Sequence, residues 1–194
     1  MCIRDRYPVG AAEVATKARR SLGIGYIGLA HYLAKQGVSY GDPEAWKLVH
    51  DLTEAFQYYL IKSTVDLAKE KGACQYSDRT KYSHGVLPID TYKTDVDELV
   101  PNKLNFDWES LRQDVKKYGV RNSTLSAQMP SESSSVVSNA TNGIEPPRGY
   151  LSIKKSKKGP LKQIVPSYNT LKNNYTLLWD MPDNTGYILS LIHI

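Results

Sequence analysis

The chain has 194 residues, of which 41% are hydrophobic and 23% are charged, and its formal net charge is +5. This length suggests one domain or a piece of a larger one, and the composition is that of a globular protein rather than a disordered one. No apolar run approaches the roughly 20 residues that a membrane-spanning helix needs, and the modest charge permits an anionic ligand without requiring nucleic acid. The two cysteines, Cys2 and Cys74, lack metal-binding spacing, so we expect no disulfide framework, no metal site and a cytoplasmic location.

The two ends differ from the rest of the chain. Residues 1–6 are too short and too polar for a signal peptide, and residues 189–194 stop within an apolar run. We interpret both hexapeptides as non-native scars, with a truncated helix as the alternative for the second. Residues 7–188 are then the protein proper.

The first helix is predicted to begin at Leu22 and to end at Gly37, because apolar residues crowd one surface and glycine is a natural C-terminal stop. Three glycines at positions 23, 25 and 28 lie in this segment. They lack the GxGxxG spacing, and no predicted strand precedes them. We therefore expect them to permit a close helix contact rather than to form a nucleotide-binding loop.

The second predicted helix has the most regular pattern in the chain. Asp42 is a favourable N-cap, Pro43 suits the first helical position, and apolar residues recur at helical spacing as far as Lys71. His31 and His50 lie on the first and second helices without a second ligand at metal spacing. We interpret both histidines as structural or surface residues.

Turns are predicted for residues 73–101, and a third helix follows them. The lone Cys74 in this region is interpreted as a small packing residue rather than a nucleophile. The third helix is capped by Asp107 and stopped by Gly119. Its predicted inward-facing residues are Trp108, Leu111 and Val115.

A serine-rich turn follows a short strand-like run at residues 123–127. Pro130 cannot continue a strand ladder, and Ser131 is a favoured helix N-cap. We therefore predict a strand, a sharp turn and the first turn of a short helix. This arrangement leaves backbone N–H groups unpaired beside serine hydroxyls, which suits a phosphate. The residues alone also fit a capped helix that binds nothing.

A hairpin and a last helix complete the prediction. Residues 150–154 and 161–166 read as paired strands joined by a basic turn, and a helix is expected over residues 167–181. The hairpin lysines could form a nucleic-acid patch, but no aromatic residues interleave with them, so a solvated tip is favoured. These lysines are Lys154, Lys155, Lys157, Lys158 and Lys162.

Six sequence stretches occur in a fixed order along the chain. They are residues 19–25 (RRSLGIG), 87–93 (LPIDTYK), 121–126 (RNSTLS), 129–135 (MPSESSS), 138–150 (SNATNGIEPPRGY) and 177–182 (LLWDMP). Together these stretches resemble the large (alpha) subunit of ribonucleoside-diphosphate reductase of class Ia. The similarity covers about residues 7–187, nearly everything between the two suspect ends.

The resemblance implies an α/β fold, in which this chain is a fragment of a ten-stranded α/β barrel, helix-rich and with a β-hairpin. It implies a parent enzyme that reduces ribonucleoside diphosphates to deoxyribonucleoside diphosphates by thiyl-radical chemistry. The parent would be an alpha-subunit homodimer that receives its radical from a metal-containing small (beta) subunit. It would use ATP and dATP as allosteric effectors and thioredoxin or glutaredoxin as reductant. No membrane or nucleic-acid partner is implied.

The resemblance transfers one functional site to this chain residue by residue. The turn formed by Pro130, Ser131, Glu132, Ser133 and Ser134 matches the family's binding turn for the substrate diphosphate. We expect the backbone N–H of Glu132, rather than its carboxylate, to face the ligand.

The family's catalytic sequence is missing from this chain. The radical cysteine lies in an Asn-x-Cys-x-Glu sequence, which does not occur here. We therefore predict no catalytic residue, no metal and no bound cofactor in this segment, which should be inactive alone. The alternatives are a fragment of a cobalamin-dependent class II reductase and a nonenzymatic nucleic-acid-binding module that uses the lysine-rich hairpin.

Overall fold

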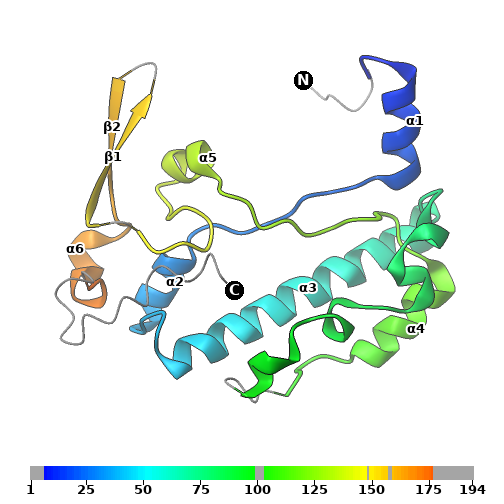
Figure 1. The fold of residues 1–194 in the computed structure, drawn as a ribbon, viewed down its shortest axis with the longest axis horizontal. Helices are drawn as coiled ribbons and strands as arrows, with labels where there is room; N and C mark the ends of the chain where they lie inside the picture. Colours follow the sequence, from blue (N-terminus) through cyan, green and yellow to red (C-terminus); the bar gives the residue numbers. More distant parts are fainter. Residues whose placement is uncertain (1–6, 99–102, 148, 157–158, 177–194) are drawn as a thin grey trace. The chain divides into compact units, whose positions relative to one another are not determined.

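The computed structural model describes residues 7–98, 103–147, 149–156 and 159–176 (Figure 1). These residues are mostly helical, with one two-stranded antiparallel hairpin. The chain divides into two compact units, Met1–Ile24 with Lys47–Ala127 and Gly25–Trp46 with Gln128–Ile194. In the described part of the chain, no helix is both long and apolar enough to cross a membrane. The proposed scars at residues 1–6 and 189–194 lie outside the described residues.

The first unit is built on the long helix α3 (Pro43–Lys71), which has the predicted bounds. Figure 1 shows α3 in cyan beside α4 (Trp108–Tyr118) in green. Buried side chains from α3, α4, the Pro88 turn and the segment after Gly119 form one core. They are Ile61, Val65, Leu87, Trp108, Leu111, Val115, Val120 and Leu125. Full burial of each large apolar side chain stabilises the fold by about 1.5–3 kcal/mol relative to exposure.

Helix α4 confirms its predicted start and end. The Asp107 carboxylate accepts a hydrogen bond from the backbone N–H of Ser110 at 2.9 Å, which satisfies one orphan donor of the first turn. Gly119 follows the helix with φ +70°. A Cβ at this position would lie 2.8 Å from Ser77 Oγ and 2.9 Å from Ala73 Cβ, so glycine is required by space as well as by conformation.

The helix predicted from Leu22 is wrong in its first half. Residues 22–27 are extended, and α2 spans only Leu29–Gln36 before Gly37 ends it with φ +73°. The backbone N–H of Ile24 donates to Leu125 O at 2.9 Å, and Ile24 O accepts from Ala127 N at 3.0 Å. Ile24 and Ser126 thus form a parallel bridge, and this long-range pairing overrides the local helical pattern.

Gly28, the last glycine of the mispredicted segment, has a different role from the expected close helix contact. Gly28 has φ +82° and directly precedes α2. A Cβ added there would lie 3.8 Å from Ala140 Cβ, which is an ordinary contact distance. Glycine at this position is therefore favoured by backbone conformation rather than by close approach.

Helix α1 (Gly10–Arg19) precedes this extended segment and has no counterpart in the sequence prediction. Its buried side chain is Ala18, whose carbonyl accepts from Tyr76 N at 3.0 Å. The turn-rich region after α3 contains four 3-10 helices, at Ser77–Arg79, Lys81–His84, Pro88–Asp90 and Thr94–Glu98. The buried Cys74 has a free thiol, which fits the packing interpretation.

The Pro88–Asp90 turn is held by one carboxylate. Asp90 Oδ2 accepts from Leu87 N at 2.8 Å, and Arg112 on α4 binds both oxygens of the same carboxylate. The Arg112 guanidinium also donates to the carbonyl of Gly85. The hydrogen bond from Arg112 is the main cause that lowers the pKa of Asp90 to about 2. This network anchors the turn to α4.

The second unit contains α2, α5 (Glu132–Val137), β1 (Leu151–Ser156), β2 (Gly159–Ile164) and α6 (Tyr168–Leu171). The predicted hairpin is confirmed, with Leu151 opposite Ile164 and Ser156 opposite Gly159. The predicted last helix is shorter than expected, because α6 passes into a 3-10 turn at Lys172–Asn174 and Tyr175 is extended. The rest of that predicted helix, from residue 177, lies outside the described residues.

We predict that the chain aggregates when it is expressed alone. Several large apolar side chains are exposed on both units, among them Leu22, Ile24, Ile153 and Ile164. Exposed apolar surface and unpaired strand edges favour association with other chains. Size-exclusion chromatography with light scattering should therefore find oligomers and aggregates. A monomer that melts in one cooperative transition would contradict the prediction.

Candidate functional site

The serine-rich turn begins the short helix α5 in the second unit. Ser131 is the N-cap residue, as predicted, and its carbonyl accepts from Ser134 N at 2.7 Å. The backbone N–H of Ser131 donates to Asn142 Oδ1 at 2.9 Å. The turn is therefore fixed both by its own first helical bond and by a side chain eleven residues later.

Two hydroxyls of this turn are available for a ligand, because Ser133 and Ser134 are exposed. The Ser131 side chain makes no capping hydrogen bond, and its Oγ is buried without a partner among the described residues. The backbone N–H of Ser133 has no backbone acceptor within the described ranges. Pro130 is exposed beside them, and the side chain of Glu132 lies outside what the structure describes.

The loop formed by residues 138–143 packs against the turn and stabilises it. Ala140 N donates to Ser135 O at 2.9 Å, and Thr141 O accepts from Gly28 N at 3.0 Å. Gly143 has φ +56°, and a Cβ there would lie 3.4 Å from the carbonyl oxygen of Met129. The side chain of Thr141 is buried, and its Oγ1 has no partner among the described residues. This loop therefore packs closely against the turn and the start of α2.

The arrangement of donors in the turn suits an anion. Unpaired N–H groups at the start of a helix and adjacent hydroxyls can donate to the same phosphate oxygens. With six residues, α5 contributes mainly through these local donors. The described side chains of the turn include no thiol and no imidazole, so the groups that it offers to a ligand are serine hydroxyls and backbone N–H donors.

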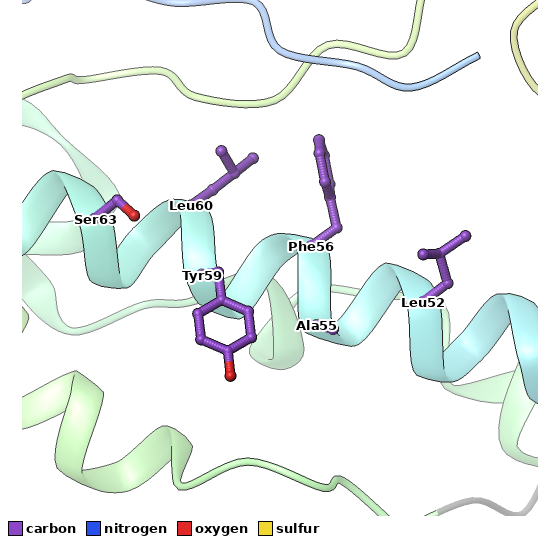
Figure 2. Close-up of a pocket in the computed structure, with 6 residues that line it drawn as sticks. All are labelled: Leu52, Ala55, Phe56, Tyr59, Leu60 and Ser63. Carbon is purple, nitrogen blue, oxygen red and sulfur yellow. The ribbon is translucent and has the colours of Figure 1, made fainter.

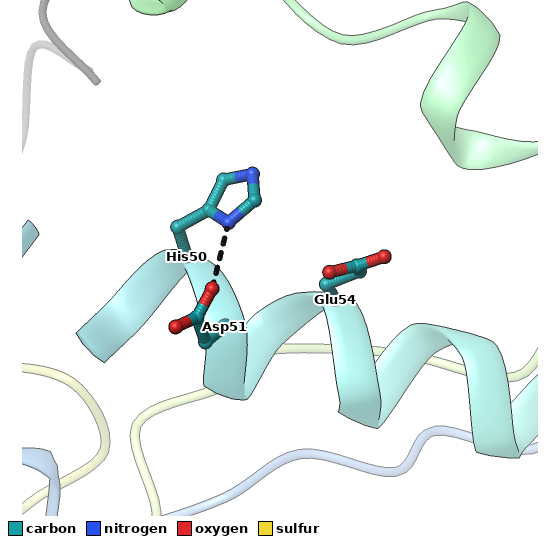
Figure 3. Close-up of side chains that lie close together, drawn as sticks. All are labelled: His50, Asp51 and Glu54. Carbon is teal, nitrogen blue, oxygen red and sulfur yellow. Dashed lines mark hydrogen bonds and ion pairs between the residues drawn. The ribbon is translucent and has the colours of Figure 1, made fainter. Parts of the chain in front are cut away.

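A second cluster lies on α3, where His50, Asp51 and Glu54 place one ligand atom each within 4.8 Å of one another (Figure 3). The carboxylates of Asp51 and Glu54 thus lie beside His50, for which the sequence predicted no second ligand at metal spacing. His50 Nδ1 lies 3.4 Å from Asp51 Oδ1. Residues four apart share a helix face, which brings His50 and Glu54 together.

Glu54 is nevertheless occupied by structural hydrogen bonds. It is 6% exposed, and its carboxylate accepts from the backbone N–H groups of Asn105 and Phe106 and from Trp108 Nε1 at 3.0 Å. Burial raises the pKa of Glu54, but the hydrogen bonds outweigh it and hold this pKa below its usual value. Glu54 therefore ties the start of α4 to α3, and the cluster is better explained by structure than by a metal.

An apolar pocket of about 360 Å³ lies along another face of α3 (Figure 2). Its lining residues are Leu52, Ala55, Phe56, Tyr59, Leu60 and Ser63. The only polar side-chain groups in this lining are two hydroxyls. This face can pack against apolar groups but carries no titratable cluster for catalysis.

The lysine-rich hairpin is described only in part. Lys162 is exposed on β2, and the side chains of residues 154–158 lie outside the described part of the structure. The nucleic-acid alternative therefore stays a prediction.

The sequence of the whole chain was compared with those of known proteins. The family described as "Ribonucleotide reductase, barrel domain" matches residues 1–185. The chain belongs to this family. It is also 60% identical over 182 residues to "Ribonucleoside-diphosphate reductase subunit alpha" of Haemophilus influenzae, 57% identical over 182 residues to "Ribonucleoside-diphosphate reductase 1 subunit alpha" of Escherichia coli and 49% identical over 175 residues to the phage T4 alpha subunit.

These matches cover 94%, 94% and 90% of the chain, respectively, but only 24%, 24% and 23% of the relatives. The chain thus spans about a quarter of the length of the reductase alpha subunits that it matches. The resemblance to this family is confirmed over most of the sequence. The role of the serine-rich turn stays a prediction.

Sequence reasoning did not single out Asn142 and Thr141 as residues that support the turn of this reductase segment. Their contacts link positions 28, 131 and 141–143, which local patterns cannot connect. The Asn142–Gly143 dipeptide is a strong turn signal and was the available clue.

The role of Glu54 can be tested in an intact reductase alpha subunit that carries this segment. A practical form is a chimera in which residues 7–187 replace their counterpart in the 57% identical Escherichia coli subunit. We expect Glu54→Gln to destabilise the start of α4 locally by about 1–3 kcal/mol, because buried donors lose an acceptor. Amide hydrogen exchange of residues 103–112 should become faster. The exposed Asp66→Asn change, which removes only surface ion pairs with Lys62 and Lys69, should leave this exchange unchanged.

The stabilisation of the start of α4 by the Glu54 carboxylate depends on pH. Because the folded-state pKa of Glu54 is lowered, its stabilisation is present above the ordinary glutamate pKa of about 4.3 and is lost as the pH falls through the lower folded value. The difference in amide exchange rate between wild type and Glu54→Gln should therefore have its maximum value at pH 6–7, where Glu54 is ionised. A rate of exchange that is the same in both proteins would exclude the structural role.

Proposed function

We propose that this chain is the part of a class Ia ribonucleoside-diphosphate reductase alpha subunit that binds the diphosphate of the substrate. The binding turn would consist of Pro130, Ser131, Glu132, Ser133 and Ser134. The observation that carries this proposal is the turn itself, in which exposed hydroxyls and first-turn N–H donors meet at the N-cap of α5. Its sequence stands where the resemblance to the family puts the diphosphate-binding turn.

The chemistry of the turn is positioning. Backbone N–H groups donate to phosphate oxygens from directions that the helix start fixes, and the serine hydroxyls rotate to add further donors. Holding the diphosphate in one place sets the ribose against a reactive group elsewhere in the enzyme. This lowers the entropic part of the barrier without any chemistry in the turn.

The parent enzyme would reduce ribonucleoside diphosphates to deoxyribonucleoside diphosphates inside a ten-stranded α/β barrel. The parallel pairing between Ile24 and Ser126 supports this, since two neighbouring extended segments joined through long helical connections are typical of such barrels. A beta subunit would supply the radical, thioredoxin or glutaredoxin would restore the dithiol, and ATP and dATP would act as effectors. The alpha subunit would work as a homodimer in the cytoplasm.

The turn is tested by replacing Ser133 and Ser134 together with alanine in the intact alpha subunit. Loss of two hydrogen bonds to a charged group should weaken binding of the nucleoside diphosphate by roughly 3 kcal/mol, or about 150-fold in Kd. Isothermal titration calorimetry measures the effect. Ser133→Thr keeps the hydroxyl and should bind nearly as the wild type does. Unchanged affinity in the double variant would rule out the proposed role.

The support from Asn142 gives an independent test. Asn142→Ala removes the acceptor that orients the Ser131 backbone, so we expect roughly fivefold weaker substrate binding, from about 1 kcal/mol for one hydrogen bond. Asn142→Asp keeps an acceptor but adds negative charge near the phosphates, and it should weaken binding more than alanine does. The exposed Asn173→Ala change is the control. If Asn142→Ala and Asn173→Ala behave alike, Asn142 does not position the turn.

The requirement for the partner distinguishes the two classes of reductase. Turnover by the intact subunit should depend on an added beta subunit. Turnover that depends on cobalamin instead would assign the segment to class II.

A further inference from the structure

A basic pocket of about 380 Å³ lies in the first unit, where the C-terminal ends of α1 and α3 meet residues 121–122. Four cationic residues line it, namely Lys17, Arg20, Lys71 and Arg121. No aspartate or glutamate is among the lining residues. The pocket is in the size range of small-ligand sites, which begins at about 300 Å³.

Two of the four cations already have carboxylate partners. Lys17 Nζ contacts Glu13 Oε1 at 2.5 Å, and Lys71 Nζ lies 3.6 Å from Glu70 Oε1. Within the described ranges, no carboxylate lies within 4 Å of the guanidinium of Arg20 or Arg121. The pocket therefore holds two guanidinium charges that no described acidic side chain neutralises.

Arg121 has a structural role that still leaves donors free. Its Nη1 donates to the carbonyls of Lys71 and Gly72 at 3.2 and 3.1 Å, and these are orphan acceptors at the end of α3. A guanidinium has five N–H donors in a planar fork. The remaining donors can bind a ligand while Nη1 stays on the helix end.

Arg20 is held in place through its backbone. It is the C-cap of α1 in the left-handed region, with φ +49°, and its N–H donates to Thr16 O at 2.7 Å. Its carbonyl accepts from Asn122 Nδ2 at 2.7 Å. Within the described residues, its guanidinium donates no hydrogen bond to the fold. The side chain is thus presented at the pocket by a fixed main chain.

The cations of this pocket are close enough to influence one another. The hydrogen bond with Glu13 raises the pKa of Lys17, whereas repulsion from Arg20 lowers it. Burial raises the pKa of the Cys74 thiol, whereas both Arg121 and Arg20 lower it. Favourable interaction with two helix C-termini explains some basic residues here. It does not explain why two guanidiniums without a described carboxylate partner, from two segments, line one hollow with Leu22 and Leu67 in its wall.

We propose that this pocket binds a small molecule that carries linked phosphate groups, either a free di- or polyphosphate or the phosphate tail of a nucleotide. Guanidinium forks match phosphate oxygens in pairs, so Arg20 and Arg121 would bind the anion and Lys17 would add a point charge. The apolar wall would accommodate the uncharged part of a nucleotide. This site is separate from the serine-rich turn and does not depend on the function proposed for it.

The test uses the intact alpha subunit with Ser133 and Ser134 replaced by alanine, so that binding of the probe by the turn is weakened. Inorganic pyrophosphate is titrated by calorimetry against this protein and against the same protein with Arg20→Gln. We expect Arg20→Gln to weaken binding tenfold or more, because hydrogen bonds between charged groups are lost. Arg79→Gln is the matched control, since Arg79 lies over the Tyr76 ring and outside the pocket.

Among the described residues, the Arg20 side chain donates no hydrogen bond to the fold, so the variant should fold, and circular dichroism checks this. Titrations with inorganic phosphate, pyrophosphate and ADP distinguish the sources. Tighter Arg20-dependent binding of ADP supports a nucleotide, and tighter binding of pyrophosphate supports a free polyphosphate. The proposal is overturned if pyrophosphate and ADP do not bind, if Arg20→Gln and Arg79→Gln have equal effects, or if only duplex DNA binds in an Arg20-dependent way.

Discussion

The hydrogen bonds between the extended segments before α2 and after α4 are the constraint on which much of the structure depends. Leu22 N donates to Thr124 O at 2.9 Å, and the Ile24–Ser126 bridge continues the pairing. Two residues further on, the Gln128 side chain takes over, since its Nε2 donates to Tyr26 O at 2.7 Å and its Oε1 accepts from Tyr26 N at 3.4 Å. An amide side chain thus replaces a strand partner just before the serine-rich turn.

The pairing of the Gln128 side chain with the Tyr26 backbone affects the candidate site. A continued backbone ladder would carry the chain straight on, whereas a side-chain amide satisfies Tyr26 and leaves the main chain free to turn at Pro130. The turn then begins from a fixed point at Gln128 and is fixed again at Ser131 through Asn142. These two anchors, three residues apart, fix the chain where the turn begins, just before the donors of residues 132–134. Preorganised donors bind a charged group without a further ordering cost.

Sequence reasoning succeeded where the determinants are local. Helix α3 and helix α4 have the predicted bounds because Pro43, Asp107 and Gly119 act within one turn of the helix that they begin or end. The helix prediction failed at residues 22–27. These residues have a helical apolar periodicity, but their hydrogen-bond partners lie about a hundred residues away in the sequence. The cluster around His50 was missed for another reason. The i, i+4 relation to Glu54 is visible in the sequence, but the hydrogen bonds that occupy Glu54 come from residues 105–108.

At the candidate site, too, local determinants were predictable from the sequence and long-range ones were not. Pro130 and Ser131 specify the turn locally, and the N-cap position of Ser131 is confirmed, but its hydroxyl does not make the capping bond that its residue type favours. A serine hydroxyl that caps its own helix accepts a hydrogen bond from a backbone N–H of the first turn. The Asn142 side chain instead holds the Ser131 backbone, and the hydroxyl is left without a partner among the described residues. The support therefore comes from a loop that local patterns do not connect to the turn. In the proposed function, this loop fixes the backbone of the turn, and the exposed hydroxyls of Ser133 and Ser134 remain for the ligand.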